Sequence, residues 1–284
     1  MKYGYLEAIN FYKRGKMKKV LVLTICFMFV GVGSISAQSE TSTLLKKHTF
    51  EVGPEISYRT YKEPDVMKEK GMMYGLVGSY TYHSKIMLKA EGRVSVGWVD
   101  YSNSGKIDDI RDYLLEVRGL GGYDFSISNS FITPFIGIGY RYLNDDSSGE
   151  VSTTGALGYE RESYYLYSPI GISFITGLRD GWSFGGTLEY DYFWWGKQKS
   201  HLSDVNPGYN DISNRQKKGD GLRGSIIFQE RFKKVDFKAE LFIRYWNIKK
   251  SNTETWTYYG TPIGYAWEPK NVSTEIGIML GVRF

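Results

Sequence analysis

The length, composition and charge of the chain limit its class before any motif is considered. The chain has 284 residues, of which 16% are aromatic and 33 are glycine, and its mean hydropathy is −0.35. It contains no run of 18 or more apolar residues, which excludes a membrane-spanning helix. Residues 1–37 account for the whole net charge of +5, because the rest holds 30 of the 36 basic and 30 of the 31 acidic residues. The net charge therefore does not indicate a nucleic-acid partner, and we expect none.

Residues 17–37 have the order of a secretory signal peptide. Met17, Lys18 and Lys19 precede an apolar run at 20–32, and small residues follow at 33–37. The apolar run has about 13 residues and is too short to cross a bilayer. We expect cleavage after Ala37, with a cut one residue earlier as the alternative.

The segments around this signal follow from it. Residues 1–16 carry no motif and are expected to be a spurious upstream extension, a real extension being the alternative. Residues 38–47 would form a short periplasmic segment before the barrel at 48–284. Cys26, the single cysteine, lies in the apolar run, so the mature chain is expected to have no disulfide and no lipid anchor.

Beyond the signal the dominant period is two. Between Val272 and Phe284 apolar and polar or small residues alternate, which indicates a strand with one apolar face. The same pattern predicts ten strands, an even number as bacterial barrels require. They are placed at 48–60, 71–82, 86–99, 111–125, 131–143, 161–176, 182–195, 221–231, 235–247 and 270–284.

The lengths of the connections indicate how these strands are arranged. Tight turns at 83–85, 126–130, 177–181 and 232–234 alternate with long polar loops at 61–70, 100–110, 144–160, 196–220 and 248–269. Short periplasmic turns and long extracellular loops are typical of an up-and-down membrane barrel. The predicted fold is therefore all-β, a closed antiparallel transmembrane β-barrel of about ten strands.

Aromatic residues cluster at the predicted strand ends, as in the two interfacial girdles of a membrane barrel. A soluble sandwich is the alternative, although it would not need a second apolar face. The aromatic residues toward the loops are Trp98, Tyr101, Tyr140, Tyr142, Tyr192, Trp194, Trp195 and Tyr245. Those toward the turns are Tyr82, Tyr123, Phe125, Trp182, Phe232 and Phe237.

Three stretches carry a resemblance to a known group. The final strand ends in Phe284, and the others are residues 137–143 and 158–167, both rich in Gly and Tyr. They resemble uncharacterised, porin-like outer-membrane β-barrel proteins of Gram-negative bacteria. The resemblance implies an outer-membrane location and makes Phe284 the signal read by the barrel-assembly machinery. The strand count is similar to that of the omptin proteases.

The polar faces of the strands would point inward and carry equal numbers of acids and bases. Because buried charges are costly unless paired, we expect an ion-pair network in a largely plugged lumen, with a small-solute pore as the alternative. The acids are Glu51, Glu55, Glu91, Glu116, Asp124, Glu189, Asp191, Asp236, Glu240 and Glu275. The bases are Arg59, Lys89, Arg93, Arg118, Arg141, Arg223, Arg231, Lys238, Arg244 and Arg283.

The loops offer little that points to catalysis. Asp108, Asp109 and Asp112, with His201 and Asp204, could serve an omptin-like protease through a general base and its carboxylate partner. Their surroundings do not resemble an omptin motif, and a lone His without a second His or Cys makes no metal site. We therefore expect no enzyme, no cofactor and no metal.

The loops instead favour binding at the cell surface. A basic loop could contact lipopolysaccharide phosphates, and an aromatic loop could bind an external ligand of unknown identity. The leading hypothesis is a non-enzymatic surface barrel in contact with outer-membrane lipid, whose long loops bind the external ligand or whose body mainly supports the envelope. The basic loop carries Lys197, Lys199, Arg215, Lys217 and Lys218, and the aromatic loop carries Trp256, Tyr258, Tyr259, Tyr265 and Trp267.

Overall fold

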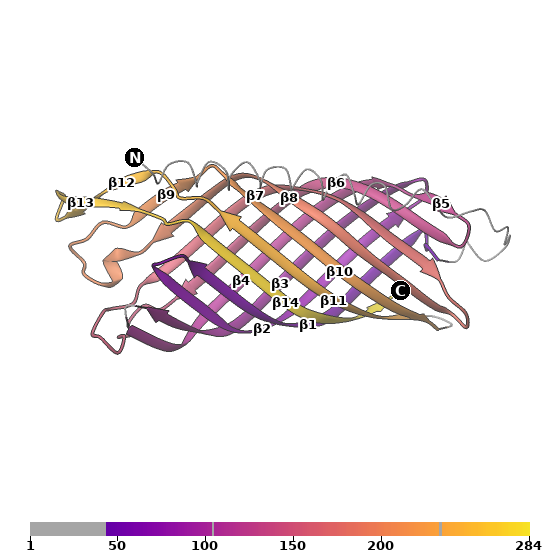
Figure 1. Cartoon of the computed structure of the whole chain (residues 1–284), viewed down its shortest axis with the longest axis horizontal. Helices are drawn as coiled ribbons and strands as arrows, with labels where there is room; N and C mark the ends of the chain where they lie inside the picture. Colours follow the sequence, from indigo (N-terminus) through magenta and orange to yellow (C-terminus); the bar gives the residue numbers. More distant parts are fainter. Residues whose placement is uncertain (1–43, 104, 233–234) are drawn as a thin grey trace, which may run out of the picture. The chain divides into compact units, whose positions relative to one another are not determined.

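The computed structural model describes residues 44–103, 105–232 and 235–284; the predicted segments 1–16 and 17–37 lie outside them (Figure 1). The long strands are β1 (His48–Glu63), β2 (Met67–His83), β3 (Ile86–Asn103), β4 (Gly105–Tyr123), β6 (Ser130–Asp146), β7 (Glu160–Gly177), β8 (Trp182–Ser200), β10 (Gly219–Arg231), β11 (Asp236–Ile248) and β14 (Asn271–Arg283). The connections hold β5 (Phe125–Ile127), β9 (Ile212–Gln216), β12 (Thr253–Tyr258), β13 (Thr261–Trp267) and the 3-10 turn η2 (Leu202–Asp204).

The ten long strands close into one antiparallel ring. Each pairs with its neighbour in the chain, and the ring is completed where β1 pairs with β14, for example Tyr58 opposite Ile276. The backbone of Phe284 adds to this seam, since its N–H donates to the carbonyl of Phe50 at 2.9 Å. The predicted all-β closed barrel and its strand count are confirmed.

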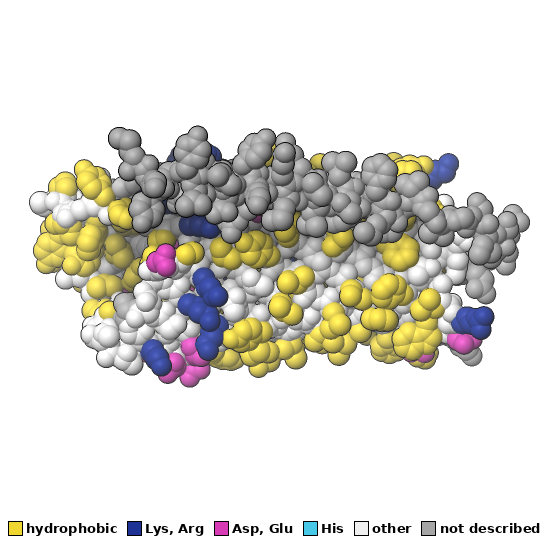
Figure 2. All heavy atoms as spheres, in the orientation of Figure 1, with side chains coloured by type: hydrophobic (Ala, Val, Ile, Leu, Met, Phe, Trp, Pro, Cys, Tyr) yellow, Lys and Arg dark blue, Asp and Glu magenta, His cyan; other side chains and the backbone are white. Residues whose placement is uncertain are grey.

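Side chains alternate between the two faces of every long strand, and the apolar face is the outer one. On β1, Ile56 and Tyr58 are exposed, whereas Glu55, Ser57 and Arg59 are buried inside the ring. Hydrophobic side chains cover the visible outer wall, and charged ones gather toward its ends (Figure 2). A wall of this polarity suits hydrocarbon, and closure leaves no unpaired sheet edge in it.

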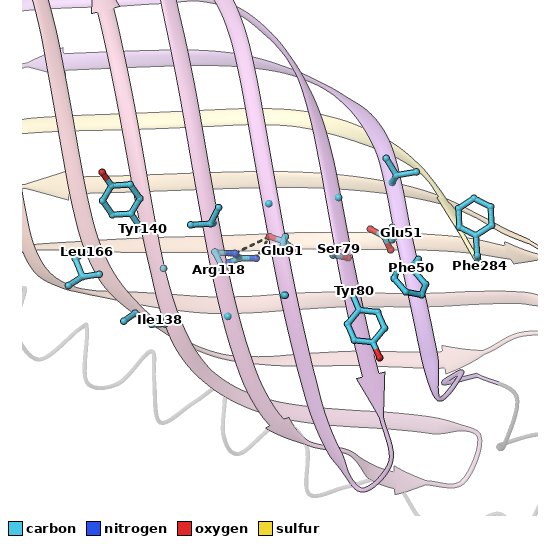
Figure 3. Close-up of a pocket in the computed structure, with 17 residues that line it drawn as sticks. Phe50, Glu51, Ser79, Tyr80, Glu91, Arg118, Ile138, Tyr140, Leu166 and Phe284 are labelled. Carbon is cyan, nitrogen blue, oxygen red and sulfur yellow. Dashed lines mark hydrogen bonds and ion pairs between the residues drawn. The ribbon is translucent and has the colours of Figure 1, made fainter.

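Part of this wall is hollowed into an apolar groove of about 800 Å³ that runs from β1 to β7 (Figure 3). It forms where small residues follow one another across the strands, with Gly78 opposite Gly92 and Ala90 opposite Gly119. A Cβ atom added at Gly92 or Gly119 would meet nothing within 4 Å. The groove belongs to the lipid-facing surface and not to the interior.

The strands extend further on the loop side than predicted. The ranges 61–70 and 100–110, predicted as long loops, are largely strand, and only residues 64–66 separate β1 from β2. Outside the hydrocarbon, polar side chains can occupy both faces of a strand. The polar residues in these ranges therefore do not end the strands. The loops at 196–220 and 248–269 also contain β9 and the β12–β13 hairpin, which were not predicted.

Across the parts of the chain that the structure describes, no helix has the length and apolar character needed to span a bilayer.

Candidate functional site

A connected series of ion pairs crosses the middle of the ring. Arg223 on β10 reaches Glu116 on β4 at 2.5 Å and Asp191 on β8 at 2.8 Å. Arg118, also on β4, reaches Glu189 on β8 at 2.7 Å. Because β6, β7 and β8 separate β4 from β10 in the ring, these contacts bridge the lumen.

The series continues toward the seam of the barrel. Arg93 on β3 contacts Glu55 at 2.6 Å, and also Glu275 on β14. Arg244 on β11 holds the same two carboxylates, at 2.8 Å from Glu55 and 3.3 Å from Glu275. Arg93 also lies 3.7 Å from Glu116, which links the two halves of the series.

The remaining charges that were predicted inside the barrel form smaller groups. Lys238 lies 2.5 Å from Glu51 and 2.9 Å from Glu240. Arg141 has its guanidinium over the Trp246 ring, 5.7 Å from the ring centre. The other contacts are Lys89 and Arg118 with Glu91, Arg283 with Glu51, Arg231 and Lys46 with Asp236, His83 with Asp124, and Arg59 with Asp112.

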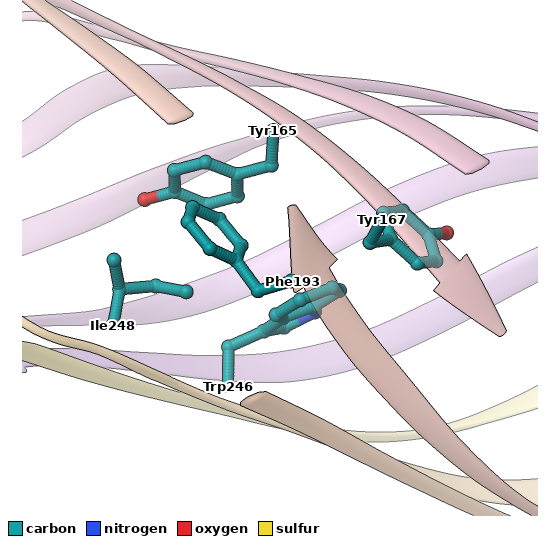
Figure 4. Close-up of a cluster of buried hydrophobic side chains, with 5 residues drawn as sticks. All are labelled: Tyr165, Tyr167, Phe193, Trp246 and Ile248. Atoms are coloured by element: carbon teal, nitrogen blue, oxygen red, sulfur yellow. The ribbon is translucent and has the colours of Figure 1, made fainter. Parts of the chain in front are cut away.

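Above the ion pairs lies a buried aromatic layer (Figure 4). Tyr167 and Trp246 meet edge to face with ring centres 5.0 Å apart, and Tyr165 packs on Phe193 at 5.5 Å. The hydroxyl of Tyr167 donates to Glu116 at 2.8 Å, which joins this layer to the charges below. Gly139 makes room for Tyr167, since a Cβ there would lie 2.3 Å from the tyrosine ring.

The barrel interior holds a chamber of about 430 Å³ at its loop end. Arg161 on β7 lies 2.5 Å from Glu63 on β1 and 2.7 Å from Glu268 in the segment before β14. Four strands separate β7 from β1 in either direction round the ring. These contacts therefore join opposite walls, and the chamber opens above them.

The chamber is acidic. Its lining includes Glu63, Glu69, Asp145 and Glu268, and Arg161 is the one Lys or Arg among the described lining residues. Asp145 is buried, and its Oδ2 atom accepts no N–H or hydroxyl group of a described residue, although the carboxyl group of Glu69 hydrogen-bonds Asp145 when Glu69 is protonated. An unpartnered buried carboxylate oxygen is costly, so this wall favours a positively charged guest.

Burial changes the protonation of these carboxyl groups. It raises the pKa of Glu268 to about 7, with Arg161 opposing the shift and Glu63 adding to it. Burial and the neighbouring carboxylate of Asp145 raise the pKa of Glu69 well above its usual range. Protons therefore neutralise part of the negative charge of the chamber.

None of these chamber residues is among the predicted site residues, because the sequence predicts long polar loops at 61–70, 144–160 and 248–269. The sequence contains one indication of this chamber. Glu63 is an even number of residues from Glu55 and Arg59 on β1, so its side chain also points inward. The residue that closes the chamber from the opposite wall, Arg161, lies at the first position of a predicted strand.

The loop residues considered for catalysis do not come together. Asp108 and Asp109 are exposed on β4, while Asp112 is buried against Arg59. Asp204, considered as a carboxylate partner of His201 in the protease alternative, accepts the backbone N–H of Glu160.

His201 faces three other carboxylates instead. Its Nε2 lies 3.0 Å from Glu162 and 3.8 Å from Glu160, and its Nδ1 lies 3.2 Å from Asp211. Burial would raise the pKa of Glu162, but hydrogen bonds from His201, Tyr164 and Tyr142 lower it to about 2. Glu160 and Glu162 come from the start of β7, and Asp211 comes from the same loop as His201, so the sequence next to His201 did not indicate these neighbours.

The aromatic residues predicted for the girdles point away from the lumen, with one exception. Trp98, Tyr192, Trp194, Tyr123, Trp182 and Phe237 are exposed on the outer wall. Tyr101 instead lines the chamber, because it stands opposite the inward Glu69. In the aromatic loop, Tyr259 and Tyr265 are exposed, whereas Trp267 also lines the chamber.

A closed ring of ten antiparallel strands with an apolar outer wall and a charged interior defines an outer-membrane β-barrel. The sequence matches the Autotransporter beta-domain family over residues 65–229, and the chain belongs to this family.

A search of solved structures finds outer-membrane barrels. The outer membrane protease OmpT from Escherichia coli is similar at 10% identity, with a TM-score of 0.59 over 86% of this chain and 99% of that chain. The translocator domain of the autotransporter NalP from Neisseria meningitidis gives 11% identity and a TM-score of 0.41, covering 97% and 98%. The toluene transporter TbuX from Ralstonia pickettii gives 9% identity and a TM-score of 0.35, over 84% of this chain and 90% of that chain. A search of curated proteins finds no match.

Proposed function

We propose that the protein is a non-conducting outer-membrane barrel that binds a small organic cation in its outer chamber. The observation that carries the proposal is the difference between two parts of the interior. In the middle, every carboxylate of the crossing series has a guanidinium or ammonium partner among the described residues. Four carboxylates and one guanidinium, that of Arg161, line the chamber, and the guanidinium of Arg59 lies beside Glu69 and Asp145 in the adjoining cavity, so the carboxylates still outnumber the guanidinium groups.

The paired middle supports a blocked lumen. Side chains just fill a barrel of about eight strands, and aqueous channels appear at about sixteen, so ten strands lie near the filled end. Arg223, Glu116 and Tyr167 form one hydrogen-bonded group at this level. Breaking such a buried pair leaves an uncompensated charge, which opposes spontaneous opening.

The composition of the chamber wall supports an organic cation. Apolar side chains such as Ile110, Leu157 and Trp267 line it together with the carboxylates. An ammonium or guanidinium group on a short apolar stem would pair with Asp145 and place its stem on this wall. Binding would also release protons from Glu268, whose pKa lies at about 7.

Calorimetric titration of the purified full-length chain in detergent with cadaverine tests this binding. We expect one site per chain, and Asp145→Asn should weaken it about tenfold or more, because a hydrogen bond to a charged group contributes about 1.5 to 3 kcal/mol. Glu230→Gln, at the turn end of β10 and so at the opposite end of the barrel from the chamber, is the matched control. Equal binding of glutarate, or no binding of cadaverine, would contradict the proposal.

Membership of the autotransporter beta-domain family favours a second candidate, a barrel whose lumen opens to pass a solute or an extended polypeptide. Current through single barrels in planar bilayers separates the two. The proposal predicts no steady openings for the native chain and openings for the double variant Arg93→Ala and Arg223→Ala. Steady openings of the native chain would instead support the channel.

The same geometry supports binding rather than hydrolysis. Asp112, the one buried member of the predicted aspartate group, is held by Arg59, and His201 lies on the outer face of the strands while the chamber lies inside. We therefore propose no catalytic role for these residues. Peptide cleavage by the purified chain that is lost in Asp109→Asn or His201→Ala would overturn this.

We further propose that the chain is exported by a signal peptide cleaved after Ala37 and that its outer face contacts lipopolysaccharide. Lys197, Arg215 and Lys217 line an outer hollow of about 720 Å³ beside Trp195, and Lys197 stands opposite Arg215 in the β8–β9 pair. Phosphate groups suit such a cluster. Replacing Lys197 and Arg215 by Gln should reduce lipopolysaccharide retained on purification, whereas Lys62→Gln should not.

A further inference from the structure

A second group of convergent side chains lies on the outer face of the wall, away from the chamber. Glu160 and Glu162 alternate outward on β7, and His201 follows the end of β8. The backbone N–H of His201 donates to the carbonyl of Glu160 at 3.0 Å, which continues the pairing of the two strands and sets the side chains next to each other. The group lies beyond Tyr142 and Tyr164, on the loop side of the predicted girdle.

Three donor atoms of this group converge. His201 Nε2 lies 3.0 Å from Glu162 Oε2 and 3.8 Å from Glu160 Oε2, and the three atoms lie within 4.8 Å of one another. Zinc is bound at about 2.0 to 2.2 Å by imidazole nitrogen and carboxylate oxygen. Ligand atoms round one such ion lie about 3 to 4 Å apart, so these three are close to the spacing that an ion requires.

The second carboxylate oxygen of each glutamate, Oε1, already accepts hydrogen bonds from neighbouring side chains. Glu162 Oε1 accepts the hydroxyl of Tyr164 at 2.7 Å and that of Tyr142 at 2.9 Å. Glu160 Oε1 accepts the amide N–H of Asn144 at 2.5 Å. These partners leave both Oε2 atoms directed at His201.

The imidazole is oriented in the same way. Its Nδ1 lies 3.2 Å from Asp211 Oδ2, and the Asp211 carboxylate accepts the hydroxyl of Ser203 at 2.7 Å. A metal-bound histidine commonly donates its second N–H to a carboxylate, which fixes the tautomer and leaves the other nitrogen free to ligate.

We propose that His201 Nε2, Glu160 Oε2 and Glu162 Oε2 form a binding site for a divalent transition metal of the Zn²⁺ class on the outer surface of the barrel. One imidazole with two carboxylates suits this class better than calcium, which takes oxygen ligands alone. Three protein ligands leave a fourth position for water. Lys199 Nζ lies 3.7 Å from Glu162 Oε2 and competes with the ion.

Binding of Zn²⁺ to the untagged, full-length chain in detergent, measured by competition with a chromogenic chelator, tests the site. We expect one ion per chain, lost in His201→Ala and Glu162→Gln. Asp211→Asn should weaken binding by about 10- to 100-fold, the usual effect of removing the carboxylate behind a ligating histidine. Lys199→Gln should strengthen it.

His48→Ala is the matched control, because His48 bonds Tyr80 at the turn end of the wall, and it should keep native affinity. Far-ultraviolet circular dichroism checks that each variant is folded, and Lys199→Gln retains all three ligands. The proposal is overturned if the native chain binds no Zn²⁺, or if folded His201→Ala binds as tightly as the native chain. In either case His201 is an ion-pair partner of Glu162 and Asp211 only. Cadaverine binding in the chamber is independent of this result.

Discussion

Replacement of Arg223 by Met probes the crossing series at its most connected residue. The Arg223 guanidinium lies 2.5 Å and 3.0 Å from the two oxygens of Glu116, 2.8 Å from Asp191 and 2.9 Å from the hydroxyl of Tyr167. Glu116 would retain Arg93 and Tyr167. Asp191, which is fully buried, would retain no basic partner among the described residues.

The expected loss follows from that uncompensated charge. Removing one partner of a buried ion pair costs about 3 to 5 kcal/mol, whereas an apolar replacement of the whole group costs far less. We therefore expect Arg223→Met to lower the free energy of unfolding by about 3 to 5 kcal/mol, and Asp191→Asn in the same chain to recover part of the loss.

Urea unfolding in lipid vesicles, followed by tryptophan fluorescence and extrapolated linearly to water, measures the change. Lys62→Met, at an exposed position on the outer end of β1, is the control and should change stability little. A loss below about 1 kcal/mol for Arg223→Met, the size of an exposed pair, would refute the reasoning.

Three further changes test other parts of the structure. Gly139→Ala should destabilise the barrel by about 1 to 3 kcal/mol by overpacking against Tyr167, whereas Gly119→Ala, which meets nothing within 4 Å, should be neutral; urea unfolding compares them. Because the pKa of Glu268 rises from 4.5 to about 7 on folding, the folded chain binds the proton more tightly. As the pH rises from about 4.5 to about 7, the free energy of unfolding should therefore fall, and Glu268→Gln should remove about 3 kcal/mol of that fall. An unchanged pH profile in this variant would exclude the effect. Deletion of Phe284 should lower the yield of barrel in outer-membrane fractions, because its backbone extends the seam; an unchanged yield would contradict its role in assembly.

The strands could be predicted because lipid imposes a strict period of two on the wall. Ile56 and Tyr58 must meet hydrocarbon while Glu55 and Arg59 turn inward, so alternation alone places the membrane-crossing part of each strand. The loop-side ends of the strands could not be placed. Beyond the hydrocarbon both faces are polar, and the sequence at 61–70 has the same composition whether it continues β1 and β2 or forms a loop.

The partners of the charged residues could not be predicted from alternation. Parity assigns Arg161 to the interior, but its pairing with Glu63 on the opposite wall depends on strand tilt and ring size. The sequence places His201 three residues from Asp204, yet its neighbours are Glu162 and Asp211. That arrangement arises because β8 ends beside the start of β7 and the following loop folds back, neither of which local sequence specifies.

Closure of the ring in the membrane is the central claim, and cross-linking across the seam tests it most directly. In outer membranes carrying the chain with Cys26→Ser, mild oxidation should join cysteines placed at Tyr58 and Ile276, which are register partners on β1 and β14. It should do so as efficiently as for the control pair Tyr58 and Met72 on β1 and β2. Efficient cross-linking of the control pair with none across β1 and β14 would contradict a closed barrel.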